Sequence, residues 1–186
     1  MAGTFAAGYT GNVTINDANG EGIAATDITA IEAATTGTVT VSNNINLTGT
    51  SAEIAAAVAD VNTFSGTPTA TLSDAHTLAE LKAINNALSG TLTLNDVTVA
   101  LSGSTADLKA ALAGTFAVGY SGNVTISDAD SANIAAADIS TVAGATDGTG
   151  TVVDNDLDDD GVCDDDEVAG CQDATACNYN SSATDS

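Results

Sequence analysis

The residues best suited to chemistry in this chain are acidic side chains close to its C-terminal end, and their spacing matches a calcium-binding loop. In such a loop, positions 1, 3, 5, 7, 9 and 12 supply oxygen ligands, and a glycine at position 6 permits a sharp turn. Here Gly161 stands at position 6 and Glu167 at position 12, where a carboxylate binds through both of its oxygens. The sequence therefore predicts a calcium site formed by Asp156, Asp158, Asp160, the carbonyl of Val162, Asp164 and Glu167.

An acidic solvated linker is the alternative interpretation of this segment. A linker would supply the aspartates, but it would rarely also place Gly161 and Glu167 at the offsets that the loop requires. The helices that flank an EF-hand are not evident, and Cys163 replaces the usual apolar residue at position 8. We therefore favour a calcium loop of a kind other than the EF-hand, with calcium as the cofactor.

Other groups that could do chemistry are few. His76 is the only histidine, it follows the turn pair Ser73-Asp74, and we expect it to be a solvated loop residue rather than a ligand or a base. The glycines occur singly, and none forms a phosphate-binding loop of the G-x-x-x-x-G-K type. The sequence thus predicts a protein that is not an enzyme.

The composition restricts both the core and the partners. The chain is 44% hydrophobic but holds only 3% aromatic residues, so its core must be narrow and crossed often by the backbone. Only 2 Lys+Arg stand against 25 Asp+Glu, and the formal net charge is −23. A charge of that sign argues against nucleic acid or an anionic membrane surface as a partner. No apolar run is long enough to span a membrane.

A long internal repeat organises most of the chain. Residues 2–40 and 113–151 align without a gap at an offset of 111 residues. Within that period, residues 91–112 give the pattern of one shorter coil. Alternating Thr and Leu at 91–94 predict a half-buried strand, and Ser104 followed by Asp107 predicts the start of a helix.

The same two signals recur through the other coils. Acids that would lie in the first turn of a helix occur at Asp27, Glu53, Glu80, Asp107 and Asp138, and inward-facing strand residues occur at Ile15, Val41, Leu72, Leu94 and Ile126, at intervals of 26, 31, 22 and 32. Thr50 and Thr77 precede their acids by three residues, as in a capping box, whereas Asp27 and Asp138 have no such hydroxyl. The pattern predicts one helix per coil.

These signals together predict a right-handed parallel β-solenoid of the α/β class. The five strands would be neighbours in one parallel sheet, each coil would carry one short helix, and four coils would make one 111-residue period. The repeat would occupy residues 1–153, beginning in the middle of a coil. Residues 154–186 hold 11 of the 25 acids and would form a small loop-rich calcium and cysteine module, truncated at its C-terminus.

Stacked coils would bring outward-facing threonines into a column. Such a ladder resembles the ice-binding face of antifreeze solenoids, although threonine is also favoured on any exposed strand because its branched side chain suits the pleat. Ice binding is therefore kept as an alternative function. The predicted ladder consists of Thr14, Thr40, Thr71, Thr93 and Thr125.

Residues 156–183 resemble thrombospondin type-3-like calcium repeats followed by a cysteine-bearing module of large secreted bacterial proteins, here with the sequence GCQDATACNYNSSATD. Cysteines pair in such modules, so the resemblance implies a disulfide between Cys163 and Cys171, with a partner for Cys177 beyond Ser186. Three cysteines in so short a segment also favour an oxidising compartment.

The repeat itself resembles the long Thr/Ala/Gly-rich repeats of giant surface or adhesin-like proteins of marine bacteria and their phages, as in LAELKAINNALSGTLTLND at residues 78–96. The resemblance implies a structural rod or spacer in a secreted or cell-surface protein. The expected partners are neighbouring repeats of the same protein or a second copy stacked end to end. A phage fibre or a filament-forming subunit remains a further alternative.

Overall fold

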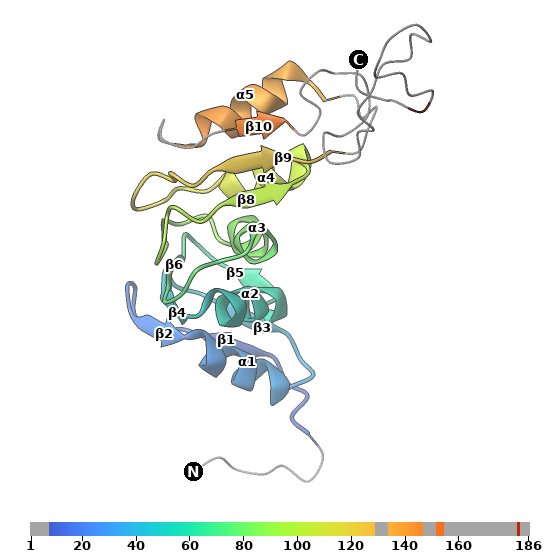
Figure 1. Ribbon diagram of the computed structural model, residues 1–186. Coiled ribbons are helices and arrows are strands. Elements are labelled where there is room, and N and C mark those ends of the chain that lie inside the picture. The colour runs from blue at the N-terminus through green and yellow to red at the C-terminus, as the bar shows by residue number, and fades with distance from the viewer. Residues whose placement is uncertain (1–7, 129–133, 147–151, 155–181, 183–186) are drawn as a thin grey trace, which may run out of the picture.

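The computed structural model describes residues 8–128, 134–146, 152–154 and 182, and these form a mixed α/β structure. Strands and helices alternate along the chain, and Figure 1 shows the helices following one another along an elongated molecule. The helices within the described residues are α1 (Ala25–Ala33), α2 (Ser51–Asp60), α3 (Leu78–Ala87), α4 (Thr105–Leu112) and α5 (Ala136–Gly144).

The strands pair only in parallel within the described residues, and they form three short sheets with the orders β1-β3-β5, β2-β4-β6-β7 and β10-β9-β8. Paired residues are 22 to 28 positions apart in the sequence, so each strand pairs with a strand from the preceding or following repeat of the pattern. The strands are β1 (Val13–Ile15), β2 (Gly22–Ala24), β3 (Val39–Val41), β4 (Asn46–Gly49), β5 (Thr63–Phe64), β6 (Thr69–Leu72), β7 (Leu92–Thr93), β8 (Leu101–Gly103), β9 (Val124–Ile126) and β10 (Val152–Asp154).

The elements recur as units of a first strand, a second strand and a helix. We number them units 1 to 5: β1-β2-α1, β3-β4-α2, β5-β6-α3, β7-β8-α4, and β9 with α5. In units 1 to 3, first strands pair with first strands and second strands with second strands. Unit 4 differs, because its first strand joins β6 and its second strand joins β9.

Helix starts follow the local sequence. Thr50 and Thr77 each form a complete capping box, in which the hydroxyl accepts from the backbone amide of Glu53 or Glu80 and the glutamate accepts from the threonine amide. Ser104 Oγ accepts from the Asp107 amide at the start of α4. No side-chain cap precedes α1 or α5. All five starts agree with the sequence-based expectation.

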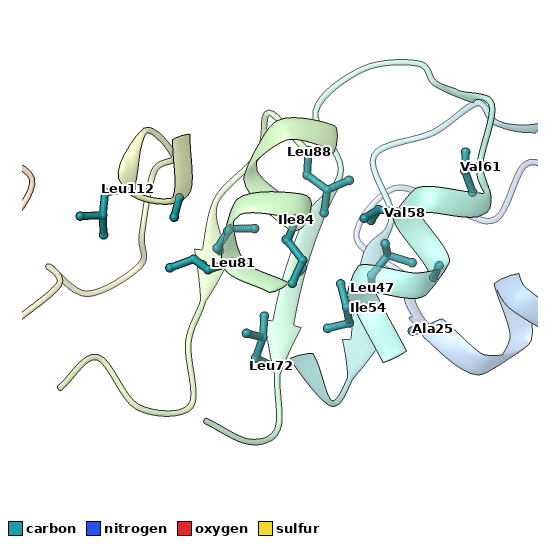
Figure 2. Packing of buried hydrophobic residues seen from close by; sticks show 14 of the residues in the cluster. Ala25, Leu47, Ile54, Val58, Val61, Leu72, Leu81, Ile84, Leu88 and Leu112 are labelled. Carbon is teal, nitrogen blue, oxygen red and sulfur yellow. The ribbon is translucent and has the colours of Figure 1, made fainter. Parts of the chain in front are cut away.

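Aliphatic side chains of successive units form one narrow core between the helices and the strands. Figure 2 shows Ile54 and Val58 of α2 and Leu81 and Ile84 of α3 directed into it. Four predicted inward strand residues are buried, namely Ile15, Val41, Leu72 and Ile126. The prediction for Leu94 is wrong: it is only partly buried, whereas Leu92, two residues earlier, is fully buried.

The predicted right-handed parallel β-solenoid, with five neighbouring strands in one sheet, is wrong. The five strands are divided among three sheets. Residues 13–15 and 39–41 lie in the first sheet, 69–72 and 92–93 in the second, and 124–126 in the third. Val41 lies opposite Phe64, not opposite Leu72.

The uneven intervals of the sequence pattern explain this error. The interval of 31 leads from Val41 in a first strand to Leu72 in a second strand, and it skips β5. The interval of 32 leads from unit 4 to Ile126, and it skips β8, whose Gly103 is the residue that lies opposite Ile126. Strands of two to four residues carry too little periodicity to separate the two kinds of strand.

Candidate functional site

The predicted calcium loop and disulfide lie outside the described residues. This applies to all six proposed calcium ligands, Asp156, Asp158, Asp160, Val162, Asp164 and Glu167, and to Cys163 and Cys171. Elsewhere, in the described ranges, no group of three or more His, Cys, Asp or Glu side chains is placed so that it could hold a metal ion. Calcium at residues 156–167 therefore stays a prediction.

The five predicted ladder threonines are divided among the three sheets. Thr14 lies opposite Thr40 in the first sheet, and Thr71 lies opposite Thr93 in the second. Thr125 lies opposite Ser102 in the third. The structure therefore brings together two separate pairs rather than one column of five.

The most specific polar chemistry in the described residues lies at the boundaries between units, where an aspartate caps the helix of the preceding unit. Asp74 Oδ1 accepts a hydrogen bond of 2.7 Å from the Ser51 amide at the start of α2. Asp128 Oδ2 accepts one of 2.7 Å from the Thr105 amide at the start of α4, and one from Thr105 Oγ1. Helix N-termini have unpaired amides and favour negative charge, so each aspartate stabilises a helix that precedes it by 23 residues.

A second set of contacts joins α2, α3 and α4 each to the acid in the first turn of the next helix. Ser51 Oγ of α2 donates to Glu80 Oε2 of α3 at 3.0 Å. The only two lysines of the chain continue the series: Lys82 of α3 pairs with Asp107 of α4, and Lys109 of α4 pairs with Asp138 of α5. Acid, lysine and hydroxyl therefore connect four successive helices.

Two of these carboxyl groups have shifted pKa values. The hydrogen bond from Lys82, opposed by a smaller effect of burial, holds the pKa of Asp107 below its ordinary value. Burial raises the pKa of Glu80, but hydrogen bonds from the amide and hydroxyl of Thr77 and from Ser51 together outweigh it, and the net pKa is lowered. Both groups are therefore held as carboxylates at neutral pH.

Asparagine side chains make a third kind of contact between units. Asn12 Oδ1 accepts from the Thr38 amide at 3.0 Å, and Asn44 Oδ1 accepts from the Thr67 amide at 2.7 Å. Asn62 Oδ1 accepts from the Val39 amide at 2.7 Å, in the opposite direction along the chain. These bonds satisfy backbone amides at the turns, where the strand ladders end.

The most buried polar cluster joins units 3 and 4, through His76 and Val99, to the loop that precedes unit 5. His76 Nε2 lies 3.3 Å from the Tyr120 hydroxyl, which donates to the Val99 carbonyl. The His76 and Tyr120 rings meet edge to face, with centroids 5.7 Å apart, and Phe116 packs against Tyr120. The prediction that His76 is a solvated loop residue is wrong, because only 3% of it is exposed.

Burial determines the charge state of this cluster. It lowers the pKa of His76, and the smaller opposing effects of Asp96, Glu80 and Asp74 do not restore the ordinary value. Burial also raises the pKa of Tyr120. His76 Nδ1 is buried without a hydrogen-bond partner, so a proton added there would have no acceptor. The cluster is therefore neutral at neutral pH and is enclosed rather than open to a substrate.

Sequence reasoning missed the aspartate caps and the histidine cluster, but a signal for the caps was present. An Asp follows the end of a strand in both Ser73-Asp74 and Ser127-Asp128, and each lies 23 residues after a hydroxyl residue at the first position of a helix. That distance is also the strand-pairing interval at those sites. No local pattern distinguishes His76 from a surface residue.

No protein family, curated protein or solved structure matches this chain. Among the helices that the structure describes, none is both long and apolar enough to cross a membrane.

Proposed function

We propose that this chain is a structural segment, a rod or spacer, of a secreted or cell-surface protein of the adhesin-like type, and that calcium stiffens its acidic C-terminal module. The observation that carries the proposal is the serial coupling of the units. Asp74 and Asp128 each complete a helix in the unit before their own, so the units are joined in order. A molecule built in this way gains length by gaining units.

The packing of the helices supports the same proposal. Contacts between helices join α1 to α2, α2 to α3, α3 to α4 and α4 to α5. Because each helix packs on its neighbours in sequence, added units would lengthen the molecule without widening its core, and Figure 1 shows the elongated shape that results. The hydrogen bonds of the parallel strands also run from unit to unit. A pull along the stack is therefore resisted by strand pairs, ion pairs and helix caps together.

Length measurements test the spacer function. Small-angle X-ray scattering on the full chain should be compared with chains into which one or two further periods, residues 2–112, are inserted after Leu112. We expect the maximum dimension to increase by the same amount for each period, at constant cross-section. A maximum dimension that stays constant, or a cross-section that widens with each period, would contradict the proposal.

The calcium part of the proposal has its own test. Extracellular modules of this type bind calcium at roughly 10⁻⁴ to 10⁻³ M, and we expect saturable heat in that range from calorimetry on the full chain. Glu167→Gln should weaken binding strongly, because a bidentate carboxylate closes the loop. Asp165→Asn is the matched control, since Asp165 stands at a position that supplies no ligand. Equal losses in the two variants would show that the segment is merely acidic.

A further inference from the structure

Where the structure describes both copies of the repeat, they form the same strand and helix but lie in different surroundings. β9 and α5 begin 111 residues after β1 and α1. The isolated bridge between Tyr120 and Thr146 repeats the one between Tyr9 and Thr35 at the same offset. A difference in burial between the copies therefore reports on what covers them, not on how they fold.

Unit 4 covers the second copy. Its β8 pairs with β9, so that Leu101 lies opposite Val124. Val124, Tyr120 and Val142 are then almost fully buried. A side chain at Gly122 would place its Cβ 1.9 Å from the Val99 carbonyl oxygen, which shows how closely unit 4 approaches. Besides the Tyr120 hydrogen bond to Val99, this interface contains the contacts of Asp128 with Thr105 and of Lys109 with Asp138.

The same face of the first copy is open within the described residues. β1 is the end strand of its sheet, whereas β9 is a central strand. An apolar cavity of about 210 Å³ lies beside β1 and α1, and three of its lining residues, Tyr9, Val13 and Ile31, correspond at an offset of 111 to residues that are buried in the second copy. Tyr9 is 44% exposed, against 1% for Tyr120. The lining consists of Tyr9, Val13, Ile31, Ala34 and Thr35.

We infer that this face of β1 and α1 is a docking surface for a second copy of residues 76–112, supplied by an adjoining period of the same repeat. The inference rests on the proposed spacer function and names the partner through which the spacer is extended. The docked copy of residues 76–112 places its Leu101 opposite Val13 and brings its Val99 over Gly11, as unit 4 does at Val124 and Gly122.

Charge supports this choice of occupant. Asp17 and Asp27 occupy the positions of Asp128 and Asp138, and the side chains of both are exposed. The α4 helix of the docked segment presents its Thr105 amide to Asp17 and its Lys109 ammonium to Asp27. Within the chain, α4 makes the same contacts with Asp128 and Asp138. In a chain with only 2 Lys+Arg, these acids match a surface that carries one of the two lysines.

The test compares the native chain with a chain in which residues 2–112 are inserted once more after Leu112. In the longer chain, the inserted copy of β1 has unit 4 before it. We expect the amides of residues 13–15 in that copy to exchange with deuterium at least about tenfold more slowly than in the native chain, near the rate of 124–126. Unchanged exchange at these amides would overturn the inference.

A matched pair of substitutions sharpens the result. Asp128→Asn removes a charged helix cap in both chains and should lower the melting temperature by about 2 to 4 °C. Asp17→Asn should have no measurable effect in the native chain, but in the inserted copy its effect should equal that of Asp128→Asn. If Asp17→Asn is silent in both chains, the inference is wrong.

The two proposals fail in different ways. If the longer chain protects residues 13–15 but does not lengthen in scattering, the periods dock and the spacer function is wrong. If the chain lengthens while these amides remain unprotected, the periods are separate bodies joined by linkers, and the docking surface is wrong.

Discussion

Residues 8–35 and their counterparts at an offset of 111, of which the structure describes 119–128 and 134–146, are similar in sequence and share a strand and a helix. They differ, however, in how much of their surface is covered. β1 and β9 have equal lengths, as do α1 and α5. Val13 is partly exposed, whereas Val124 is fully buried. Local sequence thus sets the secondary structure of a unit, and the preceding unit sets its burial. Substitutions at positions 111 residues apart can separate the two contributions.

The largest difference is expected at the tyrosines. Tyr120→Ala should lower the free energy of unfolding by about 3 to 5 kcal/mol, because it empties a buried aromatic site and removes the hydrogen bond to Val99. Tyr9→Ala should cost clearly less, since 44% of Tyr9 is already exposed. Urea unfolding followed by circular dichroism measures both. Equal losses would mean that the two copies are equally covered.

The glycines give the next largest difference. Gly122→Ala should cost about 1 to 3 kcal/mol, because the new methyl group meets the Val99 backbone and one of the two must shift. At Gly11, the nearest atoms to a new methyl group belong to the Tyr9 ring, which can rotate away. Gly11→Ala should therefore be almost neutral in the same unfolding assay. A greater loss at Gly11 would contradict the assignment of the covered face.

Lowering the pH should destabilise the second copy of the repeat more than the first, because His76 contacts Tyr120 of the second copy. Since the folded-state pKa of His76 lies below its ordinary value of 6.5, the unfolded chain binds more protons as pH falls below about 6.5. Stability should then fall by at most about 1.4 kcal/mol per pH unit from this group. Hydrogen exchange between pH 7.5 and 5.5, corrected for the intrinsic rate, should show a greater loss of protection at residues 124–126 than at residues 13–15.

His76→Gln is the control for this acid effect. Glutamine keeps a polar group near Tyr120 but does not titrate, so the excess loss of protection at residues 124–126 should disappear. An acid response that persists in this variant would assign it to carboxylates instead.

The smallest difference concerns the ion pair of α5. Asp138→Asn removes the partner of Lys109, and because both side chains are more than a third exposed the cost should be below about 1 kcal/mol. Asp27→Asn, at the equivalent position of α1, should change nothing measurable. Thermal unfolding at low salt and in 1 M NaCl checks this, since salt should reduce the cost at Asp138. A cost that does not depend on salt would point to packing rather than charge.

The sequence allowed the helices and the repeat to be predicted, because these depend on neighbours along the chain. A hydroxyl three residues before an acid is sufficient to mark a capping box, as at Thr50 and Thr77. The register of the sheets could not be predicted in the same way. Whether Val41 lies opposite Phe64 or Leu72 depends on which strand of the next unit packs beside it, and both residues are apolar.

The candidate site was predicted less well than the helices, because it too depends on which residues of other units pack beside it. Nothing beside His76 in the sequence indicates burial, because its contact with Tyr120 spans 44 residues. Leu92 and Leu94 alternate with threonines in the same way, yet only Leu92 is fully buried, because β7 ends at Thr93. These outcomes depend on the stacking of units, which no short window of sequence contains.

The aspartate caps also impose an order on biosynthesis. The ribosome makes α2 before Asp74 and α4 before Asp128, so each of these helices emerges 23 residues ahead of the carboxylate that completes its first turn. Units 2 and 4 therefore reach their final stability only after the aspartate of the next unit has followed them out of the ribosome. During synthesis, the Ser51 and Thr105 amides thus stay available to the unit that must join them.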